Sequence, residues 1–180
     1  MFTDGSVKRG EKSGWAFTAR VNGSTTGEGS GAVDMTASSM AMEVKAATEA
    51  LRFLSESPHR KAVIVTDSMS MLQKIKKGLF YADWWSLIRR SQLQFITWLF
   101  CPGHSGVQGN ERADKLAGDA VTGDLITLDP PIVLAVVRDN LQSRRPESTS
   151  YTLQLLHQMK IKASAGSHCD LRGAARRQQN

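Results

Sequence analysis

The sequence has few cysteines and no long apolar run. Its two cysteines, Cys101 and Cys169, stand far apart in the 180 residues and form no CxxC pair. This spacing gives no basis for a disulfide framework or a zinc cluster, and it favours a reducing compartment. No run of about eighteen apolar residues is present, and no charged-then-apolar leader opens the chain. The sequence therefore supports neither membrane insertion nor secretion.

Internal repeats and low-complexity runs are also absent, and the apolar fraction of 41% predicts one globular domain. The net charge of +6 is unevenly placed: residues 1–130 hold 15 basic and 14 acidic side chains, whereas residues 131–180 hold 8 and 3. We expect a domain over residues 1–128 and a basic extension, partly helical or disordered, over residues 129–180. The extension would bind a polyanion by neutralising its phosphates, or it would be a solvated arm without a partner.

Hydrophobic periodicity predicts an order of strands and helices. After an N-terminal strand, strands are expected over residues 14–22 and 24–33, within KAVIVTDS at residues 61–68, and over residues 95–101. Helices are expected over residues 36–55, 69–77 and 83–92, from Asn110 to Gly123, and in part of 132–161, beyond a linker at Asp129-Pro130-Pro131. Hairpin strands followed by strand–helix alternation predict an α/β fold with a mixed sheet and helices packed on it.

Two aspartates stand at the ends of predicted strands. Asp4 follows the first strand in FTDGS, and Asp67 follows the apolar run of KAVIVTDS. Because ligands collect at the carboxyl ends of parallel strands, we expect the two carboxylates to lie side by side. Neighbouring strands are about 4.8 Å apart, and carboxylates that close either raise a pKa or require a cation. Each motif alone would indicate only a turn or a cap.

Two acids on predicted helices join this pair. Glu43 lies early in its helix on the side of the apolar residues, so it points toward the sheet. Asp114 follows the N-cap predicted at Asn110, where the helix dipole favours an ionised carboxylate. Glu49 and Glu111 have simpler interpretations, as part of a solvated helix face and as a charge complement to a helix N-terminus.

Four segments occur in the order and approximate spacing of the type 1 ribonuclease H family: FTDGS, AMEVKAA, VTDS and PGHSGVQGNERADKLAG. The last segment resembles the versions found in non-LTR retrotransposon polyproteins. The resemblance covers about residues 1 to 122 and implies a five-stranded mixed sheet, three antiparallel strands then parallel strands, with helices on both faces. The family's catalytic residues fall on Asp4, Glu43, Asp67, Asp114 and His104.

The resemblance implies a metal-dependent endonuclease that hydrolyses the RNA strand of RNA–DNA hybrids to 5′-phosphate and 3′-hydroxyl products. The four carboxylates would hold two Mg²⁺ ions, with Mn²⁺ as a substitute, because magnesium prefers hard oxygen ligands. Asp4 would bridge both ions, Asp114 would help hold the ion that activates water, and Glu43 and Asp67 would hold the ion at the leaving oxygen. His104 would relay a proton or help product leave, or it would only bond a backbone carbonyl.

The resemblance also implies contacts to the 2′-hydroxyls of the RNA strand. The substrate-contact residues would be Gly5, Ser6, Ser38, Ser39, Met42 and Asn110. The chain departs from the family in ASSMA, residues 37–41, where many relatives have asparagines and a basic residue, and this predicts weaker hybrid binding or strand discrimination. No basic handle helix fits between Asp67 and His104. Trp84 and Trp85 resemble aromatic residues beside the substrate groove, although core packing is expected for at least one.

Family members extend upstream of TDGS, whereas this chain begins at Met1. We therefore expect a truncated first strand and an activity that rises when upstream residues are restored. The implied partners are an RNA–DNA hybrid and an upstream reverse transcriptase in the same polyprotein, with a monomeric chain and no membrane partner. The alternative is a catalytically inactive, nucleic-acid-binding relic of a retroelement. Transposases and integrases lack the segment that begins with PGHSG and are disfavoured.

Overall fold

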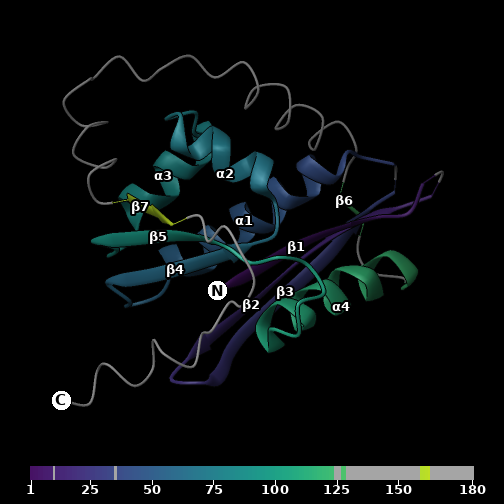
Figure 1. The fold of residues 1–180 in the computed structure, drawn as a ribbon, viewed down its shortest axis with the longest axis horizontal. Helices are drawn as coiled ribbons and strands as arrows, with labels where there is room; N and C mark the ends of the chain where they lie inside the picture. Colours follow the sequence, from purple (N-terminus) through teal and green to yellow (C-terminus); the bar gives the residue numbers. More distant parts are fainter. Residues whose placement is uncertain (10, 35, 124–126, 129–158, 163–180) are drawn as a thin grey trace.

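The computed structural model of the chain describes residues 1–9, 11–34, 36–123, 127–128 and 159–162. Seven strands form one sheet in the order β6-β3-β2-β1-β4-β5-β7 (Figure 1). The strands are β1 Phe2–Val7, β2 Ser13–Val21, β3 Ser24–Val33, β4 Lys61–Thr66, β5 Phe95–Phe100, β6 Thr127–Leu128 and β7 Met159–Lys162. The helices of the described residues are α1 Ser39–Ser55, α2 Met69–Lys76, α3 Ala82–Arg90 and α4 Gln108–Thr122. None of them is long and apolar enough to cross a membrane.

The central strands pair as the sequence predicted. β1, β2 and β3 are antiparallel neighbours, while β4 is parallel to β1 and β5 is parallel to β4. The turn between β2 and β3 contains Asn22 and Gly23, with φ angles of 51° and 84°. Both angles lie in the left-handed region that an Asn-Gly hairpin turn supplies. The prediction of three antiparallel strands followed by parallel strands is therefore confirmed.

Two short strands extend the sheet beyond the five that were predicted. β6 pairs in parallel with β3, and β7 pairs in parallel with β5. Each covers an edge whose backbone N–H and C=O groups would otherwise lack strand partners. Residues 159–161 therefore belong to a strand, where the sequence pattern had indicated a helix. The rest of that predicted helix, the linker at residues 129–131 and the extension over residues 163–180 lie outside the described residues.

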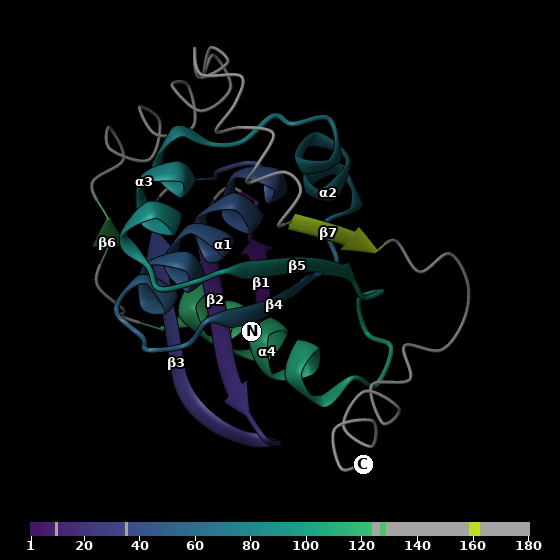
Figure 2. The ribbon, with the colours of Figure 1, turned by 90° about the vertical axis from the view of Figure 1, so that its left-hand side faces the viewer.

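Helices cover both faces of the sheet, as predicted. α1 packs on β1 and β2 with α2 and α3 beside it, whereas α4 packs on β1, β2 and β3 from the opposite face (Figures 1 and 2). Arg112 of α4 donates hydrogen bonds of 2.7 and 2.9 Å to the two carboxylate oxygens of Glu28 on β3. This bidentate contact fixes the N-terminal half of α4 to the sheet. As a result, β1 lies between α1 and α4.

α1 begins three residues later than predicted. Its first residue is Ser39 rather than Thr36, and Ser38 is the N-cap. The Ser38 side-chain oxygen accepts a hydrogen bond of 3.1 Å from the Ala41 N–H, which satisfies one of the free donors of the first turn. The helix start is therefore set by Ser38, which the sequence analysis had not identified as the N-cap.

α4 begins two residues before the predicted N-cap. Its first residue is Gln108, and Val107 is the N-cap, so the prediction of Asn110 in this role is wrong. The turn closes earlier because the Asn110 N–H already donates to the Val107 carbonyl at 2.8 Å. At the other end, the helix stops before Gly123, the residue that the sequence indicated.

The main hydrophobic core lies between the α1, α2 and α3 layer and strands β4 and β5. At its centre the rings of Trp84 and Trp98 stack with centroids 5.0 Å apart, and both side chains are fully buried. The indole N–H of Trp84 donates to the Thr48 hydroxyl of α1 at 2.8 Å. Trp84 is thus a core residue, as expected for at least one of the two tryptophans, and Trp85 is only partly buried against the same core.

Substitution of Trp84 tests this packing. Trp84→Phe retains an aromatic ring but leaves the Thr48 hydroxyl without its donor, and we expect the free energy of unfolding to fall by about 1–2 kcal/mol. Trp84→Ala leaves a large cavity and is expected to lower it by about 3–5 kcal/mol. Urea denaturation followed by circular dichroism measures both values. Equal stability of the two variants would contradict the stacked arrangement.

Candidate active site

The separation of β1 from β4 positions two aspartates. Within the described residues the two strands pair only at Phe2 and Val65. Asp4 and Asp67 each lie two residues beyond this pair, so they stand at the same level of the sheet. β1 continues beside β2 through this region, with Asp4 opposite Ala16. Asp4 therefore lies within a strand rather than after its end, which corrects the prediction, whereas Asp67 directly follows β4 as predicted.

A close approach between β1 and α1 brings Glu43 to the same place. A Cβ atom on Gly5 would lie 2.7 Å from the Cβ of Met42, so glycine is required where the two backbones meet. The Gly5 N–H donates to Glu43 Oε1 at 3.2 Å, and the Thr66 hydroxyl donates to Glu43 Oε2 at 3.3 Å. Glu43 is only 6% exposed. Its carboxylate is thus held by groups from both β1 and β4.

Three carboxylates converge in a region with little solvent. Oxygens of Asp4, Glu43 and Asp67 lie within 4.8 Å of one another. Burial, together with the negative charges of Asp67 and Asp114, raises the pKa of Asp4 to about 7. Burial and the neighbouring charges of Asp4 and Asp67 raise the pKa of Glu43 to about 9. Burial also raises the pKa of Asp67. The fully ionised cluster is therefore unfavourable unless a cation joins it.

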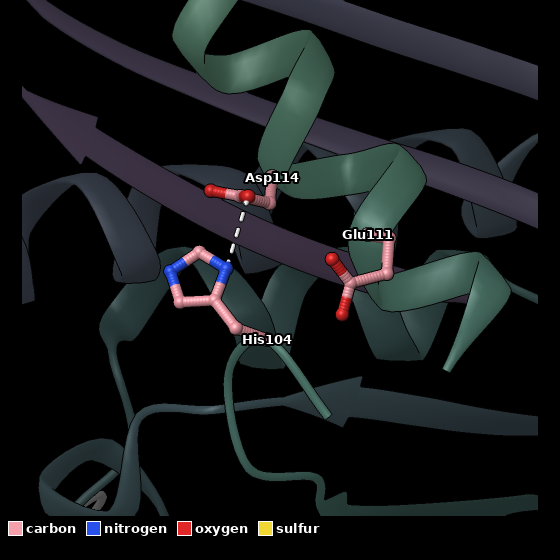
Figure 3. Close-up of side chains that lie close together, drawn as sticks. All are labelled: His104, Glu111 and Asp114. Carbon is pink, nitrogen blue, oxygen red and sulfur yellow. Dashed lines mark ion pairs between the residues drawn. The ribbon is translucent and has the colours of Figure 1, made fainter. Parts of the chain in front are cut away.

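α4 and the loop over residues 102–107 supply a second group of side chains (Figure 3). Asp114 lies in the second turn of α4, and a hydrogen bond with its carboxyl group contributes to the raised pKa of Asp4. His104 Nδ1 lies 3.5 Å from Asp114 Oδ2, and the His104 side chain is 80% exposed. Asp114 therefore contacts Asp4 on one side and the exposed His104 on the other.

Glu111 also belongs to this group, although the sequence indicated only a charge complement at a helix end. Ligand atoms of His104, Glu111 and Asp114 lie within 4.8 Å of one another. Glu111 Oε1 accepts a hydrogen bond of 3.0 Å from the Gly106 N–H of the loop. A glutamate in the first turn of a helix gives no sequence signal for this contact, because the contact depends on the path of the preceding loop.

The residues predicted to contact substrate differ in their access to solvent. Those with partial or full exposure are Gly5, Ser6, Ser38 and Ser39. In contrast, the side chain of Met42 is fully buried, and Asn110 is 1% exposed. The Asn110 Oδ1 is buried and has no hydrogen-bond partner within the described part of the chain. α4 carries this amide into the interior, so the structure gives no support to its predicted role in substrate contact.

The side chains of this site fit a hard divalent cation. Asp4, Glu43 and Asp67 offer only carboxylate oxygens, and Asp114 adds a fourth carboxylate beside Asp4. Magnesium and calcium prefer such ligands, whereas zinc and copper sites draw on imidazole and thiolate groups. A cation would also offset the burial and the neighbouring negative charges that together raise the pKa values of Asp4 and Glu43. The arrangement can therefore hold a divalent cation at the point where β1, β4, α1 and α4 meet.

Comparisons with known proteins agree with this geometry. The curated ribonuclease H of Novosphingobium aromaticivorans is 34% identical over 138 residues, which are 67% of this chain and 94% of that protein. The Pol polyprotein of equine infectious anemia virus is 27% identical over 172 residues, which are 91% of this chain but 13% of the polyprotein. The structure of the foamy viral protease-reverse transcriptase in complex with an RNA/DNA hybrid matches 67% of this chain and 19% of that chain, with a TM-score of 0.55 and 20% identity.

The RNase H family matches residues 1–122, a range that contains strands β1 to β5, all four helices of the described residues and every acid of the site. The shared fold of the foamy viral structure is consistent with this match. The polyprotein relative shows that similar sequences also occur within longer chains. On this match, the chain belongs to the ribonuclease H family.

Proposed function

We propose that this ribonuclease H is a metal-dependent endonuclease that hydrolyses the RNA strand of RNA–DNA hybrids, leaving 5′-phosphate and 3′-hydroxyl ends. The observation that carries the proposal is the convergence of Asp4, Glu43 and Asp67, whose oxygens lie within 4.8 Å of one another. Curated relatives named ribonuclease H support the reaction, and the foamy viral neighbour in complex with an RNA/DNA hybrid supports the substrate.

Asp4, Glu43, Asp67 and Asp114 would hold magnesium, with manganese as a substitute. When bound, two such ions lower the pKa of the attacking water and stabilise the charge on the phosphate and on the leaving oxygen. Asp4 is central because its carboxyl group neighbours those of the three other acids. The Gly5 N–H and the Thr66 hydroxyl orient Glu43, as described above. His104 would exchange a proton at Nδ1 or Nε2 with the leaving group or help the product leave.

Contacts with the hybrid would come from the helices α1 and α2. The exposed Ser38 and Ser39 at the start of α1 would meet the 2′-hydroxyls of the RNA strand. Basic side chains of α2 and its C-terminus, Lys74, Lys76 and Lys77, would neutralise phosphates in place of a longer basic helix. These roles follow from the family resemblance and from the exposure of the residues.

We also infer an origin from a retroelement polyprotein. The match to the equine infectious anemia virus polyprotein covers 91% of the chain, more than the 67% covered by the Novosphingobium relative. The segment PGHSGVQGNERADKLAG, with its resemblance to non-LTR retrotransposons, supports the same inference. In this view the domain over residues 1–128 would follow a reverse transcriptase, act as a monomer and carry a basic extension over residues 129–180.

Cleavage of a labelled RNA–DNA hybrid in the presence of Mg²⁺ tests the function. We expect the hybrid to be cut, and the same RNA to be resistant as a single strand and as an RNA duplex. Asp67→Asn replaces one carboxylate of the cluster by a neutral amide. The cleavage rate should fall by about a thousandfold, as expected when several kcal/mol of transition-state stabilisation are lost. Binding without cutting by the unmodified protein would instead indicate an inactive nucleic-acid-binding relic.

The raised pKa values predict how stability depends on pH without divalent cations. Because the pKa values of Asp4 and Glu43 are raised to about 7 and about 9, the folded chain keeps protons that the unfolded chain has released. The resulting stabilisation is complete below about pH 4 and is lost as the pH rises through these values. Asp4→Asn should therefore raise the free energy of unfolding on the order of 2 kcal/mol at pH 8, and by little at pH 4.

Urea denaturation with a chelator at the two pH values measures this difference. Asp119→Asn, which removes an exposed acid on α4, is the matched control and should change neither value. Added Mg²⁺ should stabilise the unmodified protein at pH 8 more than Asp4→Asn, since a ligand that binds only the folded state raises its stability. Identical urea midpoints for the unmodified protein and Asp4→Asn at pH 8 would show that the carboxylates do not repel one another.

A further inference from the structure

The loop over residues 102–107 adopts a backbone conformation that needs support. His104 has a φ angle of 51°, and Gly106 has a φ angle of 76°. The left-handed region is open to glycine but is unfavourable for a residue with a side chain. The conformation at His104 is therefore expected to relax unless neighbouring contacts hold it, and its relaxation would move the imidazole away from Asp114.

Besides the backbone bonds that the Val107 carbonyl accepts from the Asn110 and Glu111 N–H groups, two side-chain contacts connect this loop to α4. The Gly106 N–H donates to Glu111 Oε1 at 3.0 Å, and His104 Nδ1 lies 3.5 Å from Asp114 Oδ2. The Gly106 contact is a charge-assisted hydrogen bond of ordinary length, whereas the His104 contact is longer than a good hydrogen bond. Within the loop, the Ser105 hydroxyl donates to the Pro102 carbonyl at 2.7 Å, which closes a turn but does not attach it to the helix.

Glu111 is well placed to hold the loop because its own helix is fixed. The next residue, Arg112, makes the bidentate contact with Glu28 of β3. Glu111 also lies in the first turn of α4, where a negatively charged side chain interacts favourably with the helix dipole. Figure 3 shows Glu111 and Asp114 on the same helix, both directed toward the loop residue His104.

We propose that Glu111 is a positioning residue: by accepting the Gly106 N–H, it holds the loop over residues 102–107 so that His104 stays against Asp114. The proposal rests on the proposed function, because it assigns Glu111 an effect on the reaction through His104. Glu111 itself need not touch the substrate or a metal ion. What it must supply is an acceptor oxygen at the right distance from the Gly106 N–H.

Substitutions of Glu111 can test the length of the side chain separately from its charge. Glu111→Gln keeps an acceptor oxygen at the same reach but removes the charge. Glu111→Asp keeps the charge but is shorter by one methylene, so its oxygens cannot reach the Gly106 N–H from the same helix position. Glu111→Ala removes both. Asp119→Asn again serves as the control, since it removes an exposed charge from the same helix at a distance from the loop.

The experiment measures the loop and the reaction separately. Water-exchange NMR of the Gly106 amide reports on the loop, and we expect about fivefold faster exchange in Glu111→Asp and Glu111→Ala than in Glu111→Gln. Steady-state cleavage of the hybrid should show the same order in kcat, with the Gln variant retaining more activity than the Asp variant. KM should change little, and urea denaturation checks that all variants are folded.

Several outcomes would overturn the proposal. Higher kcat in Glu111→Asp than in Glu111→Gln would mean that the charge is needed, as for a cation held by His104, Glu111 and Asp114. Unchanged Gly106 exchange in Glu111→Ala would mean that the contact does not hold the loop. If the unmodified protein failed to cleave the hybrid, the proposed function would fall, while the Gly106 exchange rates would still decide whether Glu111 holds the loop.

Discussion

The mutual repulsion of buried carboxylates is the constraint on which the site depends. Asp4 and Glu43 are each 6% exposed, and burial, together with the charges of the neighbouring acids, raises the pKa of both carboxyl groups. The fold maintains this arrangement by directing specific donors, from Gly5 and Thr66, onto Glu43. Stability comes from elsewhere, above all from the apolar layer around Trp84 and Trp98. The chain therefore separates the region that supplies stability from the region that carries charge.

The acids of the site are supported in two different ways. Glu43 and Asp67 are held from the α1 side of the sheet, next to the main core. Asp114 is held by α4 on the other face, with His104 and Glu111 on its exposed side. Asp4 on β1 lies between these two groups. This division explains why one part of the site is buried and rigidly bonded, whereas the other depends on a solvent-exposed loop.

Much of this fold was readable from the sequence because the relevant signals are local. The apolar run before Asp67 and the Asn22-Gly23 turn each correspond to the expected element. The position of Asp4 inside β1 was missed because the strand is prolonged by its pairing with β2, a contact distant in sequence. β6 and β7 were missed because strands of two and four residues carry no periodic pattern. The contact between Glu111 and Gly106 depends on tertiary structure alone.

The single pairing of Phe2 with Val65 has a consequence for how the spacing of the acids is set. β1 pairs along its whole length with β2, and β4 pairs along its whole length with β5, so the boundary between the antiparallel and parallel parts of the sheet runs between Asp4 and Asp67. A small rotation of one part against the other would open or close the gap between Asp4 and Asp67. The distance between these two carboxylates therefore depends on how β1 and β4 pair, and not on a loop.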